Sequence, residues 1–190
     1  MRCILILLLI LNSSNGKGQA RKNFPKPSDC SFLLNKGYTK EFCSYNQLYQ
    51  FKGIPFESKL NVVDTLMDLK RSKYWANVYD IGNEEYTDWG ITKFTRGNVK
   101  FQNGKMICIT LDLFEEKGKV PDYKFEGIKK YLSEIFGEPR IAKTSNDNNL
   151  WFDWVGPKIE INLIYFGMGG TVTVSICSTK LSSDNTLDNL

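Results

Sequence analysis

An Asn-Gly dipeptide between two apolar-rich stretches constrains the fold of this chain most strongly. Residues 99–102 and 105–114 flank Asn103-Gly104, and Asn-Gly is the preferred centre of a two-residue turn that joins antiparallel strands. Later segments also alternate apolar with polar side chains, which is typical of strands with one buried face. Tight connections of this kind favour a mostly antiparallel sheet.

Two segments have the spacing of amphipathic helices instead. Residues 58–71 predict a first helix, with Ser58 as its N-cap. A second helix is predicted to begin at Pro121-Asp122 and to end at Gly137. Four apolar residues of this second helix are expected to bury one stripe against the sheet: Phe125, Ile128, Leu132 and Ile135.

The order of elements is helix, strands, helix, strands, which predicts an α+β fold. We expect a mostly antiparallel sheet with two helices packed on one face, and the other face open to solvent or a partner. Besides 99–102 and 105–114, the predicted strands are 48–55, 74–80, 91–95, 140–143, 150–155, 159–165 and 171–177.

The first twenty residues have the pattern of a secretory signal peptide. Arg2 precedes the apolar run 3–11, and small polar residues follow it. Nine apolar residues are too few to cross a bilayer, which takes about 20. We therefore expect cleavage after Gly16 or Ala20 and an exported chain, periplasmic or secreted, with no transmembrane segment after cleavage. A buried N-terminal strand is the alternative.

The remaining chain is expected to divide into three parts. Residues 21–47 are polar and lack clean periodicity, which indicates an irregular leader. Residues 48–179 contain every predicted strand and form a single α+β domain, or alternatively two half-units split near 118–121. Residues 180–190 form a polar tail without a core-forming pattern.

Four cysteines remain once Cys3 is removed with the signal. An even number of cysteines in an exported chain indicates disulfides, and we favour the pairs Cys30–Cys43 and Cys108–Cys177. Free buried thiols at positions 108 and 177 are the alternative. The cysteine spacing does not suit a metal site, and the chain has no histidine.

Composition and motifs give little support to catalysis or to nucleic-acid binding. The formal net charge is +4 from 25 basic and 21 acidic residues, and it falls to +2 if Arg2 and Lys17 are removed with the signal. A nearly neutral chain gives no case for nucleic acid. Without histidine, the commonest general base and metal ligand is absent, and we predict no cofactor and no metal.

Asp112, Glu115 and Glu116 are better explained as solvated charges at a strand end than as a catalytic carboxylate set. Gly167–Gly170 lacks the Lys-Ser/Thr of a phosphate loop and predicts a turn.

The tryptophans are the candidate binding residues. Trp151 and Trp154 are three apart in one predicted strand, so their side chains point to opposite faces. Tyr and Trp are enriched at protein interfaces because they bury a large area and keep a polar tip. We predict binding roles for Trp75, Trp89, Trp151 and Trp154, with packing into the core as the alternative for each.

Three short motifs carry a resemblance in layout. They are the segment 49–58, which contains Gly-Ile-Pro-Phe before a helix, the hairpin 103–106, and Phe-Gly-Glu-Pro at 136–139. Over residues 49–178 the chain resembles small exported bacterial modules, among them periplasmic immunity-type proteins, and its layout is similar to that of β-lactamase inhibitory protein. The resemblance implies a binding module and carries over no catalytic residue.

The function predicted from these observations is that of a non-enzymatic exported binding protein. It would cover a partner protein with the open face of its sheet, as an immunity protein or an inhibitor does. Two alternatives stay open at this point. One is an envelope hydrolase with a carboxylate-based site, and the other is a carrier of a small ligand or lipid.

Overall fold

The computed structural model describes residues 34–35, 37, 39–89, 91–115, 118–141, 149–167 and 170–179. The predicted signal at 1–20, the tail at 180–190 and Cys30 lie outside these described residues. None of the described helices is long and apolar enough to cross a bilayer.

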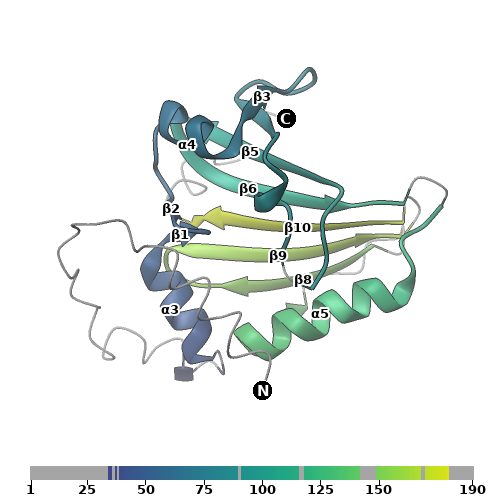
Figure 1. Ribbon diagram of the computed structural model, residues 1–190. Helices are drawn as coiled ribbons and strands as arrows, with labels where there is room; N and C mark the ends of the chain where they lie inside the picture. The colour runs from purple at the N-terminus through teal and green to yellow at the C-terminus, as the bar shows by residue number, and fades with distance from the viewer. Residues whose placement is uncertain are drawn as a thin grey trace, which may run out of the picture.

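An eight-stranded antiparallel sheet forms the centre of the molecule (Figure 1). The strands lie side by side in the order β3-β4-β5-β6-β10-β9-β8-β7. This architecture confirms the predicted α+β fold with a mostly antiparallel sheet. The strands are β3 (Leu69–Arg71), β4 (Val78–Ile81), β5 (Arg96–Gln102), β6 (Lys105–Leu113), β7 (Arg140–Ile141), β8 (Leu150–Val155), β9 (Ile159–Phe166) and β10 (Thr171–Ser178).

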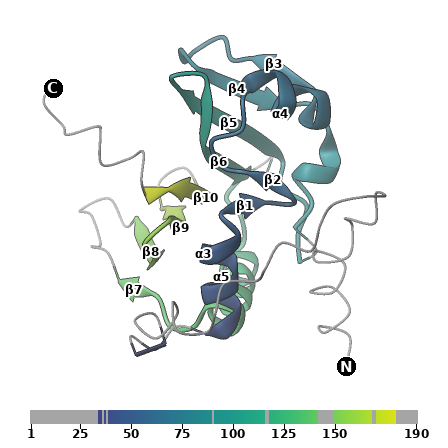
Figure 2. The same cartoon turned by 90° about the vertical axis from the view of Figure 1, so that its left-hand side faces the viewer.

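Each half of the chain contributes one helix followed by a four-stranded meander. The first half is α4 (Leu60–Met67) with β3 to β6, and the second is α5 (Asp122–Phe136) with β7 to β10. The halves join edge to edge through their last strands, β6 and β10. Figure 2 shows α4 and α5 on the same side of the sheet. A small hairpin, β1 (Gln50–Phe51) with β2 (Ile54–Pro55), precedes α4.

The helix-bearing face of the sheet carries the hydrophobic core. One complete row of core residues crosses five neighbouring strands in register, and all its members are buried: Val99, Ile109, Ile176, Ile161 and Trp154. Burying each of these side chains contributes roughly 1.5–3 kcal/mol of transfer free energy. The core therefore runs without interruption through both halves.

Helix α5 packs on this core through the predicted stripe, with one change. Phe125, Ile128 and Leu132 are buried as expected, and Phe125 stacks against Phe152 and Tyr165 of the sheet, with ring centroids 6.0 and 5.1 Å apart. The last buried position is Phe136 rather than Ile135, which is half-buried.

The first helix is shorter than its apolar periodicity predicts. Helix α4 ends at Met67 because Asp68 adopts a left-handed conformation with φ 49°, and β3 follows at once. The predicted N-cap, Ser58, is also wrong. Lys59 holds that position without a side-chain cap, while the Ser58 hydroxyl donates to the Pro55 carbonyl at 2.7 Å.

Part of the leader that was expected to be irregular is a helix. Residues 40–48 form α3 (Lys40–Leu48). The sequence signal is weak because only a few side chains of α3 face inward, among them Phe42, whose ring meets that of Phe136 at 5.6 Å. The helix therefore owes its stability to packing against α5 rather than to its own periodicity.

Two predicted strands before the Asn-Gly hairpin differ from the structure. Residues 74–77 belong to a loop, and β4 begins at Val78. Residues 91–95 form no strand and take part only in an isolated bridge between Asp88 and Lys93. By contrast, the predicted turn is confirmed, since Asn103 and Gly104 both have positive φ, 51° and 73°, as a type I′ turn requires.

Candidate functional site

The sheet face opposite α4 and α5 is covered by none of the described helices (Figure 2). Strand pairing aligns its outward side chains into rows that run across the sheet. We call one of these the polar row, because it crosses seven neighbouring strands, from β3 to β8, and every residue in it is polar. Its members, in sheet order, are Lys70, Asp80, Asn98, Thr110, Ser175, Asn162 and Asp153.

A second row on this face ends at an exposed aromatic side chain, and we call it the Trp151 row. It runs in register from β5 to β8 through Arg96, Asp112, Thr173, Ile164 and Trp151. Trp151 is 37% exposed and lies directly opposite the half-buried Ile164. The two residues form an apolar contact point on the β8 side of this face.

Hydrogen bonds tie the centre of this face together. The Thr110 and Ser175 hydroxyls lie 3.2 Å apart across the β6–β10 junction. In the neighbouring row, the Thr173 hydroxyl donates to Asp112 at 2.7 Å. Further out, Arg96 donates through Nη2 and Nε to Asp80, at 2.6 and 3.1 Å. These contacts hold the side chains of four adjacent strands in fixed positions.

Other polar groups on the same face have no partner among the described residues. The side-chain amides of Asn98 and Asn162 flank the Thr110–Ser175 pair, and neither forms a side-chain hydrogen bond with another described residue. One carboxylate oxygen of Asp153 is buried and also lacks a hydrogen-bond partner. A buried polar atom without a partner costs free energy, so the Asp153 oxygen favours a ligand that donates a hydrogen bond. The partly exposed amides of Asn98 and Asn162 can bond to such a ligand as well.

Asp112 is the most perturbed acidic group on the face. Burial raises the pKa of its carboxyl above the usual 3.8, although the Thr173 hydrogen bond and the charge of Arg96 both act to lower it. Its neighbour on the chain, Glu115, instead forms an ion pair with Lys124 of α5, and Glu116 lies outside the described residues. Asp112 and Glu115 therefore have different partners, Thr173 and Lys124.

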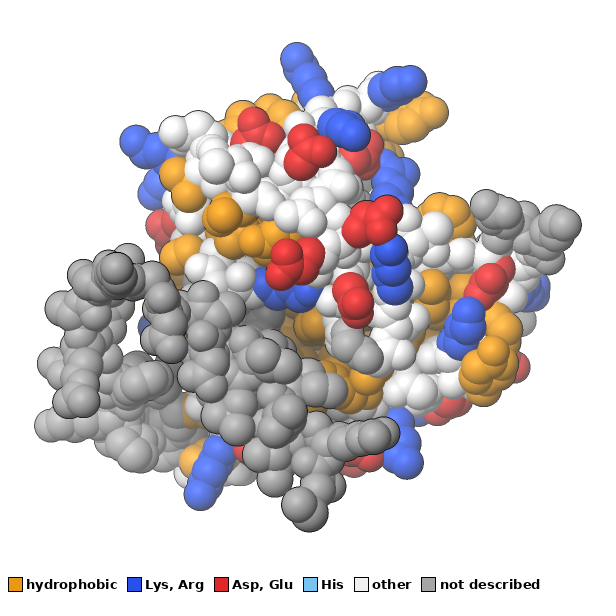
Figure 3. All heavy atoms as spheres, viewed as in Figure 1, with side chains coloured by type: hydrophobic (Ala, Val, Ile, Leu, Met, Phe, Trp, Pro, Cys, Tyr) orange, Lys and Arg blue, Asp and Glu red, His pale blue; other side chains and the backbone are white. Residues whose placement is uncertain are grey.

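The charges of this face are mixed in sign. Basic Lys70, Lys100 and Arg96 share it with acidic Asp80 and Glu160. The helix-bearing side is mixed as well, with blue and red side chains interspersed in Figure 3. A surface that attracts nucleic acid gathers basic residues on one face, and neither side does so among the described residues.

A disulfide crosses the same face at the junction of the two halves. Cys108 of β6 lies opposite Cys177 of β10, with Cα atoms 4.0 Å apart and sulfurs bonded at 2.05 Å. The predicted pair is thus present. Cys43 is also disulfide-bonded, but its partner lies outside the described residues, so its pairing with Cys30 stays a prediction.

The four predicted tryptophans occupy different environments. Trp154 is fully buried on the core face and donates from Nε1 to the Gly137 carbonyl at 2.7 Å. Trp89 is also buried, against Phe94. Trp75 is 68% exposed in the loop between β3 and β4.

Of the four, only Trp151 belongs to a row of the helix-free face. It lies on β8, whereas Trp75 lies beyond β3, at the other end of the strand order. The tryptophans therefore do not form one patch. The polar row, by contrast, was not anticipated from the sequence, because alternation assigns each residue to a face but leaves the register between distant strands open.

Within the described part of the chain, no group of three or more His, Cys, Asp or Glu side chains could hold a metal ion. Gly167 and Gly170 belong to the turn between β9 and β10, and the two residues between them lie outside the described ranges. Comparison with protein-family models, with curated proteins and with solved structures finds no match.

Proposed function

We propose that the chain is a non-enzymatic binding protein that covers a partner protein with the helix-free face of its sheet. The polar row carries this proposal. It presents seven polar side chains in register on a face that no described helix covers, and the amides of Asn98 and Asn162 are free to bond with a partner.

The Trp151 row supports a protein as the partner. Interface energy is concentrated in a few aromatic or Arg anchors surrounded by polar groups, and this row offers Trp151 with Arg96 at its other end. Mixed charge suits a folded protein surface better than a polyanion or a membrane. The layout of a helix and four strands, given twice, fits the resemblance to exported inhibitor and immunity modules.

Export is part of the same proposal. The Cys108–Cys177 disulfide fits an oxidising compartment, and the charged and apolar order of residues 1–20 fits a secretory signal. N-terminal sequencing of the protein from the envelope fraction tests this part. A chain that retains Met1 would refute it.

The binding face is tested by two arginine substitutions of matched chemistry. Asn162→Arg places a long cation at the centre of the helix-free face, whereas Asn61→Arg places one on the exposed side of α4. A partner would first be identified by crosslinking and mass spectrometry, and its affinity then measured by calorimetry. We expect Asn162→Arg to weaken binding at least tenfold, and Asn61→Arg to leave it unchanged.

The opposite pattern, with loss only in Asn61→Arg, would place the interface on the helix side and overturn the proposal. Unchanged binding in both variants would do the same. Circular dichroism of each variant shows whether it retains the fold.

A further inference from the structure

The loop between β3 and β4, residues 72–77, presents two aromatic side chains to solvent, and we call it the aromatic loop. Tyr74 is 80% exposed and Trp75 is 68% exposed. The loop lies next to β3 at the upper edge of the molecule in Figure 1. The Ser72 amide donates to the Val78 carbonyl at 3.0 Å, which closes the base of the loop. Both rings therefore project from a base that is fixed to the sheet.

Basic side chains surround the base of this loop. Arg71 precedes the loop and Lys73 lies within it. Lys100 of β5 comes just before Phe101, whose amide donates to the carbonyl of Asn77 in the loop at 2.8 Å. All three cations are exposed, and none forms an ion pair or a side-chain hydrogen bond with another described residue. The segment 69–79 contains no acidic residue.

The acidic side chains on the neighbouring strands face other cations. Asp80 pairs with Arg96 at 2.6 Å and lies opposite Lys70 in the pairing of β3 with β4. Asp112 also interacts with Arg96, so these two acids and two bases balance. Glu160 of β9 lies three strands away from β5 in the sheet. The charge at the base of the loop is therefore not cancelled by the helix-free face.

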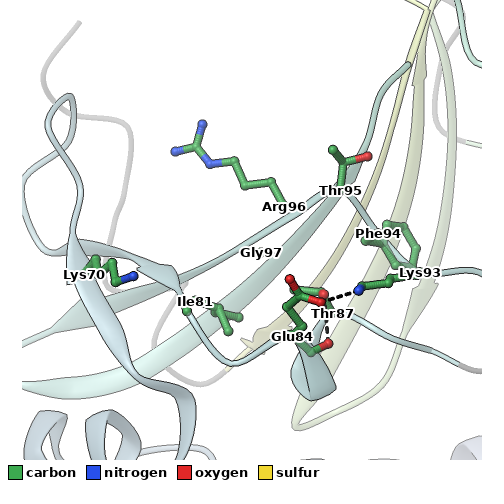
Figure 4. A pocket seen from close by; sticks show the side chains of 10 residues that line it. Lys70, Ile81, Glu84, Thr87, Lys93, Phe94, Thr95, Arg96 and Gly97 are labelled. Atoms are coloured by element: carbon green, nitrogen blue, oxygen red, sulfur yellow. Dashed lines mark hydrogen bonds and ion pairs between the residues drawn. The ribbon is translucent and has the colours of Figure 1, made fainter. Parts of the chain in front are cut away.

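The excess acidic charge in this half of the chain lies at the opposite end of β4. It comes from the end of α4 and from the segment 84–88, through Asp64, Asp68, Glu84, Glu85 and Asp88. Lys52 and Lys93 are the lysines that contact this group, and Figure 4 shows Lys93 paired with Glu84. Near the β5–β6 turn, Glu57 pairs with Lys105 at 3.4 Å. Positive charge without a counter-charge thus collects at the loop.

We propose that the aromatic loop, with Arg71, Lys73 and Lys100 at its base, binds the surface of an anionic phospholipid membrane. Tyr and Trp are enriched where a bilayer meets water, because their rings are apolar and their polar tips stay hydrated. Lys and Arg next to such rings are attracted to anionic headgroups. The guanidinium of Arg71 can also donate two parallel hydrogen bonds to a lipid phosphate.

This inference goes beyond the proposed function, and neither depends on the other. The aromatic loop follows β3, the first strand in the sheet order, whereas Trp151 lies on β8 near the other end. A chain bound to a membrane through the loop could still present its helix-free face to a partner protein. The test of membrane binding uses vesicles and no protein partner, so it can fail while the proposed function stands.

The test is vesicle flotation of the chain purified from the envelope fraction, with its N-terminus determined by sequencing. Vesicles of phosphatidylcholine alone are compared with vesicles in which half of the lipid is phosphatidylglycerol, at equal salt. We expect partition to the anionic vesicles to be at least tenfold stronger. Brominated acyl chains in the same vesicles quench a tryptophan that inserts among them. Trp75→Phe should abolish this quenching, and Trp151→Phe should retain it.

Two double variants separate the loop from the overall charge of the chain. Arg71→Gln with Lys73→Gln should weaken partition to the anionic vesicles at least tenfold. Lys40→Gln with Lys130→Gln removes the same charge from exposed positions of α3 and α5 and should change partition less than twofold. Circular dichroism shows whether each variant retains the fold.

Several results would overturn the inference. They are equal partition to both kinds of vesicle, equal losses in the two double variants, and quenching that persists in Trp75→Phe. Soluble polyglutamate serves as a final comparison. If it binds as tightly as the anionic vesicles and brominated lipid does not quench, the loop has an acidic protein as its partner, and the membrane proposal is wrong.

Discussion

Trp151 and Trp154 lie three residues apart on one strand and should respond to the same substitution in opposite ways. Trp154→Ala removes a ring that is fully buried and packs against Phe136 at 6.4 Å between centroids. It also leaves the Gly137 carbonyl without its indole donor. Trp151→Ala removes a ring that is 37% exposed and contacts a cross-strand neighbour.

The magnitudes follow from these environments. Truncating a buried Trp to Ala costs about 3–5 kcal/mol of unfolding free energy, which in a domain of this size lowers Tm by roughly 6–20 °C at about 2–4 °C per kcal/mol. A cross-strand surface pair contributes only about 0.2–1 kcal/mol. We therefore expect Trp154→Ala to lose at least about 2 kcal/mol more stability than Trp151→Ala.

Urea denaturation followed by far-ultraviolet circular dichroism measures both values without relying on tryptophan fluorescence. Trp154→Phe serves as a control, because it keeps an aromatic ring and removes only the indole donor and part of the volume. It should fall between wild type and Trp154→Ala. Equal losses for Trp151→Ala and Trp154→Ala would refute the assignment of the two side chains to opposite faces.

Three further predictions concern the core, the helix-free face and the junction. Leu132→Ala, at a fully buried position of α5, should cost about 2–5 kcal/mol in urea denaturation. Burial raises the pKa of Asp112 above its usual value of 3.8. Just above pH 3.8 the native state therefore binds more protons than the unfolded chain does. The free energy of unfolding of the wild type consequently falls as pH rises through this window. Asp112→Asn should lack that loss, and parallel wild-type and variant curves of stability against pH would contradict it. Replacing Cys108 and Cys177 by Ser should destabilise the chain by about 4 kcal/mol in the chain-entropy model for a separation of 69 residues, and an unchanged urea midpoint would contradict this.

Elements set by local chemistry could be predicted from the sequence. The turn at Asn103-Gly104 needs two positive φ angles that few other dipeptides adopt. The apolar stripe of α5 and the glycine after it define that helix within the chain itself. The alternation along β9 and β10 likewise assigns every residue to a face.

Features that depend on distant partners could not be predicted in this way. Helix α3 is stabilised by α5, some 90 residues away in the chain. Helix α4 ends where the backbone of Asp68 adopts a left-handed conformation. The sequence after Asp68 is compatible with a longer helix, so it does not mark this end. The polar row requires the register of seven strands at once, which no local pattern contains.

The junction between β6 and β10 has a consequence for how the chain assembles. Every other pairing in the eight-stranded sheet joins strands that are neighbours in the chain, so each meander can form early through local contacts. The β6–β10 pairing joins residues 69 positions apart at Cys108 and Cys177 and must wait for a long loop to close. We therefore expect docking of the two meanders to be the slow step of folding in this topology. Cys108 and Cys177 lie opposite each other only after β6 and β10 have paired. Oxidation of the two thiols after this step would therefore stabilise the complete sheet as a disulfide.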